Sequence, residues 1–270
     1  MIKRPTIVDS AANEIFRNRA TSLNYDPDDQ WVGDYVNYEW EHSRYIFQRP
    51  ECDLQNKKVL EFGCNMGATS IVLASLGADV TAIDISKDYI ELARLNAKRY
   101  GLNNKIRYIL IDNSSDLSFG NNYFDYISCN SVLEYVPKKE LKNILSELNR
   151  VLNFNGIIFI LGTSNKLSPR EVHSNKWLVN YIPESFDKLI FKDISPERGI
   201  NPFSIIKFLP NYDNIDLSDN NQNYLKTQEL LGSSNLKLYL MKIIGSFAHV
   251  FNISLGMLTP NIFLALKKIK

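Results

Sequence analysis

One segment of the sequence indicates the fold most clearly: Val59-Leu60-Glu61-Phe62-Gly63-Cys64-Asn65-Met66-Gly67-Ala68-Thr69. Its first four residues form a short, mostly apolar run typical of a strand, and apolar residues at helical spacing follow over 69–76. Gly63 and Gly67 predict a tight turn at which the backbone can approach a ligand closely beside a helix N-terminus. The same turn occurs in dinucleotide-binding proteins, so this motif alone leaves a dehydrogenase open.

Strand and helix patterns alternate on the C-terminal side of this turn. We expect strands at 79–85, 106–111, 123–128 and 156–161, and helices at 86–100 and 138–152. Helices of this length between strands imply βαβ crossovers and a parallel sheet covered on both faces. The predicted fold is therefore α/β: a doubly wound, Rossmann-like, seven-stranded and mostly parallel sheet with an inserted helical cap. Ser86 is expected to cap the helix that follows it, and Gly101 to end it.

We predict four parts along the chain: an aromatic-rich helical leader or lid at 1–56, an α/β core at 57–162, a cap insertion at 163–200 and a C-terminal completion of the sheet at 201–270. A helix near 203–209 and strands near 214–217 and 261–268 are expected in the last part, with a surface loop at 213–223. The apolar segment 236–258 carries Lys237 and Lys242 and no acid. A buried cap helix is the favoured interpretation, and a helix lying in a membrane interface is the alternative.

Composition excludes several classes of protein. Lys plus Arg number 31 and Asp plus Glu 30, so no global field would gather nucleic acid, and no nucleic-acid partner is expected. Three cysteines without a Cys-x-x-Cys spacing predict neither a disulfide framework nor a metal site. The N-terminus lacks the apolar run of a signal peptide, which together with the cysteines predicts a cytoplasmic protein.

Four further motifs follow the glycine turn in order: Ala82-Ile83-Asp84-Ile85-Ser86, Ile111-Asp112-Asn113, the run from Phe124 to Val136, and the run from Leu148 to Gly156. With them the chain resembles the class I S-adenosylmethionine-dependent methyltransferases, in particular the branch that modifies quinones, sugars and other small metabolites. The resemblance covers the middle of the chain and implies S-adenosylmethionine as cofactor. No metal is implied.

The resemblance also implies which residues bind the cofactor. The acid in the second motif, Asp84, would accept from the ribose hydroxyls, and Asp112 from the adenine amino group. The full expected set is Glu61, Gly63, Cys64, Asn65, Gly67, Asp84, Ile85, Asp112, Asn113 and Asn130. Asn65 stands where the family often has glycine, which is tolerable because Asn enters the left-handed region readily. Tyr135 stands where His is common, which weakens any transfer of catalytic detail.

Methyl transfer from a sulfonium mainly requires that the acceptor be positioned, and a general base helps when the acceptor is a hydroxyl. His is the natural base near neutral pH. His173, in the predicted cap, is the first candidate and His42 the second, although a surface or structural role for His173 stays open. Acceptor contacts are expected from Tyr38, Trp40, Tyr135 and Trp177.

The predicted function is transfer of a methyl group from S-adenosylmethionine to a small molecule, at a hydroxyl of a sugar, lipid or quinone-like metabolite. N-methylation of a small molecule is one alternative. A nucleotide-dependent oxidoreductase and a non-catalytic cofactor-binding scaffold are alternatives from other classes. Methylation of nucleic acid or protein is disfavoured because Asn130-Ser131-Val132-Leu133 lacks the Asn-Pro-Pro-aromatic signature of amino-adenine enzymes.

Overall fold

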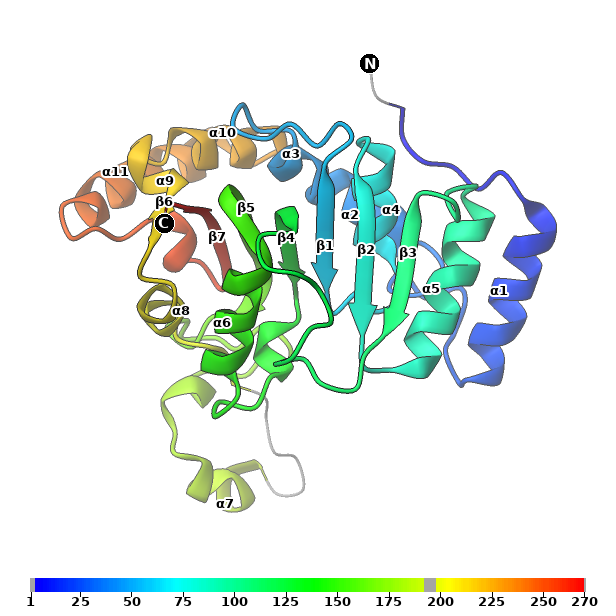
Figure 1. Ribbon diagram of the computed structural model, residues 1–270. Coiled ribbons are helices and arrows are strands. Elements are labelled where there is room, and N and C mark those ends of the chain that lie inside the picture. The colour runs from blue at the N-terminus through cyan, green and yellow to red at the C-terminus, as the bar shows by residue number, and fades with distance from the viewer. Residues whose placement is uncertain (1–2, 192–197, 270) are drawn as a thin grey trace. The chain divides into compact units, whose positions relative to one another are not determined.

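The computed structural model describes residues 3–191 and 198–269 (Figure 1). Part of the predicted cap insertion, 192–197, lies outside the described residues. The chain forms two compact units: the first runs to Ser128 and takes in Val151–Gly156, and the second consists of Cys129–Arg150 and the residues from Ile157 on. The division into four parts stays a prediction.

Seven strands of the described residues form one sheet, in the order β3-β2-β1-β4-β5-β7-β6. β1 pairs in parallel with β2 and with β4, and β2 with β3, whereas β7 runs antiparallel to β5 and β6. The strands are β1 Lys58–Phe62, β2 Asp79–Asp84, β3 Ile106–Leu110, β4 Phe124–Asn130, β5 Leu152–Ser164, β6 Tyr212–Asn214 and β7 Asn261–Lys268. The predicted mostly parallel seven-stranded α/β fold is confirmed. The chain order reverses between β1 and β4, where open α/β sheets bind ligands.

The helices next to β1 and β2 follow the predicted punctuation. α4 (Ala68–Ser75) begins directly after the glycine turn, and α5 (Lys87–Arg99) follows β2. The Ser86 hydroxyl accepts from the backbone N–H of Tyr89, which satisfies one of the free donors of the first turn of α5. Gly101 takes a φ of +68° just past the end of that helix, as its lack of a side chain allows.

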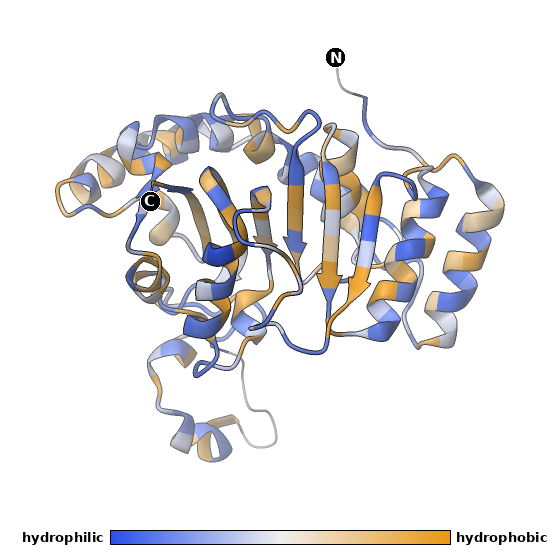
Figure 2. Ribbon diagram, viewed as in Figure 1, coloured by the Kyte–Doolittle hydropathy of each residue, from blue (hydrophilic) through white to orange (hydrophobic). Residues whose placement is uncertain are grey.

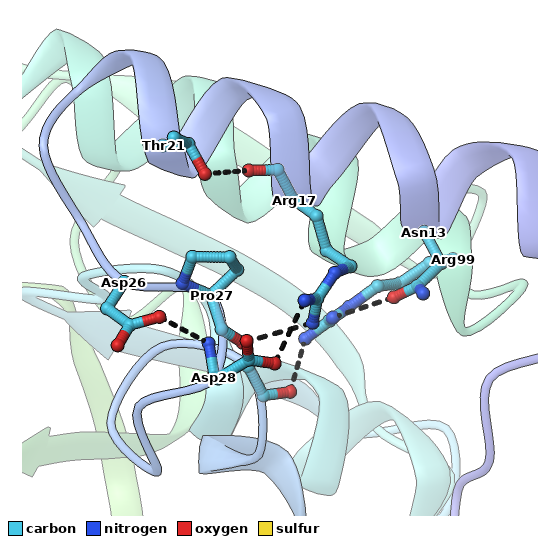
Figure 3. A network of polar contacts seen from close by, with 8 residues as sticks. Asn13, Arg17, Thr21, Asp26, Pro27, Asp28 and Arg99 are labelled. Carbon is cyan, nitrogen blue, oxygen red and sulfur yellow. Dashed lines mark hydrogen bonds and ion pairs between the residues drawn. The ribbon is translucent and has the colours of Figure 1, made fainter.

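The N-terminal helix α1 (Ser10–Ser22) packs against α5, and a buried arginine joins them. The Arg99 guanidinium donates to Asn13 Oδ1, Gly33 O and Asn96 Oδ1 at 2.8–3.0 Å, and it lies 3.9 Å from the centre of the Phe16 ring. Figure 3 shows Arg99 and Asn13 beside Arg17, which donates to the segment that contains Pro27 and Asp28. The leader is therefore part of the first unit's core.

The predicted aromatic helix forms as α2 (Tyr35–His42), followed by the short α3 (Arg44–Phe47). α2 packs against α4, the helix that starts at the glycine turn. Val36, Glu39 and Trp40 are the buried residues of α2, and two of them are the apolar positions that an amphipathic helix turns inward. Glu39 is an acid on this buried face, and the burial of an acid requires a physical explanation.

The second unit contains most of the chain after β4. Its helices are α6 Leu141–Val151, α7 Asp187–Phe191, α8 Pro202–Phe208, α9 Ile215–Ser218, α10 Gln222–Leu230 and α11 Asn235–His249. The strand expected near 214–217 forms earlier, as β6 (Tyr212–Asn214), and 215–218 is helical. The surface loop expected at 213–223 is wrong. The Asn214 side chain accepts from the N–H of Asp216 and starts α9 instead, and both Asp216 and Asn221 are fully buried.

α11 is not the buried cap helix that was favoured. Only Gly245 and Ala248 are buried within it. Large apolar side chains along and just after the helix are exposed: Leu236, Tyr239, Leu240, Ile243, Ile244, Phe247, Val250 and Phe251. Figure 2 shows this hydrophobic colouring along α11. Among the described residues, no helix is both long and apolar enough to cross a membrane.

Candidate functional site

The glycine turn after β1 is tied to β2 by backbone hydrogen bonds. The N–H groups of Gly63 and Cys64 both donate to Ile83 O, at 2.9 and 3.0 Å, and Gly67 N–H donates to Cys64 O. Gly63, Asn65 and Gly67 have φ values of +73°, +49° and +77°, so Asn65 occupies the left-handed region as expected of its residue type. The turn therefore presents its backbone beside the end of β2.

Gly67 is required by packing as well as by its backbone angle. A Cβ at this position would lie 2.5 Å from Tyr108 Oη and 3.1 Å from Ala93 Cβ. Tyr108 is on β3 and Ala93 on α5, so this glycine lets the start of α4 approach both elements. Close helix–strand packing is one of the roles of glycine in such turns.

Asp84, at the end of β2, is held by two backbone donors. Asn65 N–H donates to Oδ2 and Ser86 N–H donates to Oδ1, each at 2.9 Å. A carboxylate has about four acceptor positions, so oriented acceptor capacity remains for hydroxyl groups of a ligand. Ile85, the next residue, is exposed and offers an apolar surface beside this acid.

Glu61, on β1, is a buried acid with hydroxyl partners. Its side chain accepts from Ser70 Oγ on α4, and Thr69 is a second hydrogen-bond partner. Burial, together with repulsion from Glu39 and Asp84, raises the pKa of Glu61 to about 8, although the two hydroxyls offset part of the rise. With a pKa of about 8, Glu61 is mostly protonated at neutral pH unless a cation binds beside it.

Glu39 brings a further carboxylate from α2 to this region, and it was not among the residues predicted from the sequence. Its Oε2 accepts from Ser43 Oγ, and Tyr35 is also hydrogen-bonded to it. Burial raises the pKa of Tyr35, and the charges of Glu39 and Glu61 raise it further. An acid on the buried side of an amphipathic helix was the available signal. Buried acids that repel each other favour a cationic ligand.

Asp112 and Asn113 follow β3 and line a hollow of about 450 Å³. Asp84 is in register with Leu110, two residues before Asp112, so these acids belong to the ends of adjacent strands. Both Asp112 and Asn113 are exposed, and Asn113 Oδ1 accepts from Ser115 N–H, which fixes the turn. The other lining residues are Arg107, Ile109, Leu110, Ile111, Asp116, Ser118 and Phe119.

The predicted acceptor residues of the first unit lie on α2. His42 is exposed and stacks on Tyr38, with ring centres 4.1 Å apart, and its Nδ1 lies 2.7 Å from Tyr38 O. Since a carbonyl only accepts, Nδ1 carries the proton there. Trp40 is buried, with the Arg44 guanidinium 5.2 Å from its ring centre.

The remaining predicted residues belong to the second unit. Asn130 ends β4, and Ser131 follows it with a φ of +48° and donates its N–H to Leu161 O. A side chain on Gly162 would collide with Ser131 Oγ, at 2.3 Å, so this turn packs closely on β5. Tyr135 and Trp177 both expose their rings.

His173 lies beside an acid that no sequence motif had singled out. Its Nε2 is 3.4 Å from Glu134 Oε1, and its ring centre is 5.9 Å from that of Tyr135. The Glu134 side chain is 0% exposed, and that of His173 is 37% exposed. The predicted cap histidine and the turn after β4 are thus brought together within the second unit.

Part of the chain is similar to known proteins. Residues 59–156 match the family described as methyltransferase domain. The ubiquinone biosynthesis O-methyltransferase of Histophilus somni (strain 2336) is 35% identical over 118 residues, which are 43% of this chain and 48% of that protein. The chain spans about half the length of this curated relative.

Two solved structures share the fold over almost the whole chain. A putative sarcosine dimethylglycine methyltransferase from Galdieria sulphuraria matches with a TM-score of 0.54 at 14% identity and covers 96% of this chain and 98% of its own. The cyclase SpnF matches with a TM-score of 0.52 at 14% identity, covering 95% and 96%. Since one of these is named as a cyclase, the fold alone does not identify the reaction.

Residues 59–156 form a class I S-adenosylmethionine-dependent methyltransferase domain, and S-adenosylmethionine is the cofactor of this domain. The family, the enzyme class and the cofactor predicted from the motifs are confirmed. The roles of individual site residues stay predictions.

Proposed function

We propose that this protein transfers a methyl group from S-adenosylmethionine to a hydroxyl of a small molecule of the sugar, lipid or quinone-like kind. The observation that carries the proposal is the pair of buried acids, Glu61 and Asp84, at adjacent strand ends beside a glycine turn. We infer an oxygen acceptor from the similarity to a ubiquinone biosynthesis O-methyltransferase, together with a histidine that lies beside an acid.

The site fits this cofactor by charge. Burial and the charges of Glu39 and Asp84 raise the pKa of Glu61, so a sulfonium or ammonium group beside it would favour its ionised form. Asp84 would hold the ribose hydroxyls, Asp112 and Asn113 the adenine edge, and Ile85 an apolar face of the base. The backbone of Gly63, Cys64, Asn65 and Gly67, with Asn130, would complete the cofactor contacts. When bound, S-adenosylmethionine supplies an electrophilic methyl group.

In this proposal His173 accepts the proton of the acceptor hydroxyl, and His42 is the second candidate for that role. Tyr135 and Trp177, whose rings are exposed, would contact the acceptor, as would Tyr38 and Trp40 on α2. General-base assistance of this kind contributes roughly 10²- to 10⁴-fold. N-methylation of a small molecule remains the alternative within this class.

Calorimetric titration with S-adenosylmethionine and with NADH tests the cofactor assignment against an oxidoreductase. We expect S-adenosylmethionine to bind and NADH not to. Asp84→Asn should weaken binding about 10-fold or more, since it removes a charged acceptor for hydroxyl donors. Asp79→Asn, at the exposed start of the same strand, is the matched control. Retention of NADH alone would contradict the proposal.

Transfer of an isotope-labelled methyl group tests the acceptor class. A catechol, a hexose glycoside and a primary amine serve as probes. We expect label on a hydroxylated probe and a turnover reduced by His173→Gln at unchanged cofactor affinity. Label on the amine alone would favour N-methylation, and cofactor binding without transfer to any probe or to a metabolite extract would favour the non-catalytic scaffold.

We also propose that α11 contacts an anionic membrane surface, which would suit a lipid or quinone-like acceptor. The support is the row of exposed apolar side chains on α11 together with Lys237 and Lys242, with no acid from residue 236 to the end of the chain. A helix of this composition lies in an interface with its apolar face among the acyl chains and its cations near anionic headgroups.

Flotation with vesicles tests the membrane contact. We expect the protein to float with vesicles that contain phosphatidylglycerol, to float less with pure phosphatidylcholine, and to lose binding as salt is added. Phe247→Ser should weaken flotation, whereas Leu189→Ser, at an exposed apolar residue of α7, should not. Failure to float, or a dimer that Phe247→Ser dissociates, would contradict the proposal.

A further inference from the structure

Glu134 is a buried acid that accepts no hydrogen bond from the described residues. It lies in a single 3-10 turn, Leu133–Tyr135, directly after β4. Its side chain is fully buried, and among the described residues neither carboxylate oxygen has a hydrogen-bond partner. Burying a carboxylate costs several kcal/mol unless it is paired, so a structural role alone accounts poorly for an acid here.

The group that faces this acid is the His173 ring. Glu134 Oε1 lies 3.4 Å from Nε2, within ion-pair distance but longer than a hydrogen bond. Catalytic hydrogen bonds are often long in the absence of substrate and shorten in the reacting complex. The His173 side chain as a whole is 37% exposed, so solvent reaches it although it lies beside the buried acid.

The loop that carries His173 is itself anchored. Glu171 is fully buried and accepts from the N–H groups of His173 and Ser174 at 3.0 and 2.6 Å, and from Ser164 Oγ at the end of β5. Although burial raises the pKa of Glu171, these backbone donors outweigh it, so its pKa lies below the usual value. A charged Glu171 therefore holds the backbone of His173 against β5.

We propose that Glu134 is a positioning residue that accepts the Nε2 proton of His173 and leaves Nδ1 as the basic nitrogen. The inference rests on the proposed function, in which His173 is the base. As the acceptor O–H bond breaks, its proton forms a bond to Nδ1, and the oxygen lone pair forms the new bond to the methyl carbon while the carbon–sulfur bond breaks and its electrons stay on sulfur. Glu134 stabilises the imidazolium that forms, as the acid of a Ser-His-Asp triad does.

The ring nitrogens of His173 provide a test that needs no acceptor. The chain has three histidines, so His173→Gln assigns the signals in a nitrogen NMR spectrum. In the full-length protein, we expect neutral His173 to carry its proton on Nε2. In the Glu134→Leu variant, we expect a mixture of the Nε2–H and Nδ1–H tautomers, as in an imidazole with no acceptor beside it. Glu140→Gln, at the start of α6, is the control and should change nothing. An unchanged tautomer in Glu134→Leu would overturn the proposal.

Kinetics then separate the positioning role from the function. Glu134→Gln should lower kcat about 10²-fold or more with unchanged affinity for S-adenosylmethionine, since a misplaced tautomer cost a triad enzyme about 10⁴-fold. Thermal unfolding checks that both Glu134 variants fold. If the tautomer responds but the wild-type protein transfers no methyl group, the proposed function fails and the pairing stands. If transfer occurs and neither Glu134 variant changes it, the positioning role fails.

Discussion

The raised pKa of Glu61 gives a prediction about cofactor binding and pH. The group is mostly protonated below pH 8, because burial and neighbouring acids raise its pKa to about 8. A cationic ligand favours the ionised form, so binding should release a proton near neutral pH, and affinity should rise with pH until it levels above about 8. Calorimetry of S-adenosylmethionine binding in buffers of different ionisation enthalpy measures this release.

Two variants make the Glu61 prediction specific. Glu61→Gln should remove the proton release and the pH dependence. Glu91→Gln removes an exposed acid of α5 whose pKa is lowered by its bond to Arg19, and it should alter neither. A heat of binding that is independent of the buffer in the wild-type protein would show that Glu61 does not ionise when the cofactor binds.

Gly67 gives a second prediction at the residue scale. Gly67→Ala places a Cβ 2.5 Å from Tyr108 Oη at a φ of +77°, so we expect it to destabilise the protein by about 2 kcal/mol and lower Tm by roughly 4–8 °C. Tyr108→Phe should restore part of this loss, because it removes the colliding oxygen. Gly120→Ala is the control, since no atom lies within 4 Å of its Cβ. Equal Tm values for the two alanine variants would refute this role of close packing.

The candidate site was predictable from the sequence where it depends on local order. Glu61 and Asp84 lie near the ends of β1 and β2 and Asp112 follows β3, and parallel strands place their carboxyl ends at one edge of a sheet. Glu39, Glu134 and Glu171 were not identified from the sequence, and the partner of Glu134, His173, lies on a distant segment of the chain. The distance between Glu134 and His173 depends on how the loop after β5 folds back, which no local pattern in the sequence contains.

At the scale of elements, the contact between α1 and α5 predicts how the leader is held. Arg99→Met keeps an unbranched apolar side chain of similar reach to the aliphatic part of arginine but leaves Asn13, Gly33 O and Asn96 without their donor. We expect a loss of about 3 kcal/mol and earlier proteolysis of the segment before α2. Lys98→Met changes the exposed residue next to Arg99 on α5 and should alter neither the stability nor the rate of proteolysis. Proteolysis at the wild-type rate in Arg99→Met would contradict this role.

Elements were predicted well where hydrophobic periodicity was long and less well where it was short. α5 and β7 formed close to their expected bounds because periodicity, caps and flanking residues agree. The run at 214–217 is too short to distinguish a strand from a helical turn, and the side chain of Asn214 decides for the turn. In α11 apolar residues occur around the whole helix, so the pattern does not indicate whether another element covers them.

At the scale of the whole molecule, the two strands that the units share predict a single unfolding transition. β4 (Phe124–Asn130) and β5 (Leu152–Ser164) each begin in the first unit and end in the second, so neither unit can lose its strands without disturbing the other. We therefore expect one calorimetric transition. S-adenosylmethionine at 100 times its Kd should stabilise the whole chain by about 2.7 kcal/mol and raise Tm by roughly 5–11 °C. Asp84→Asn should show a smaller rise at the same cofactor concentration. Two transitions, of which the cofactor shifts only one, would show that the units unfold independently despite sharing two strands.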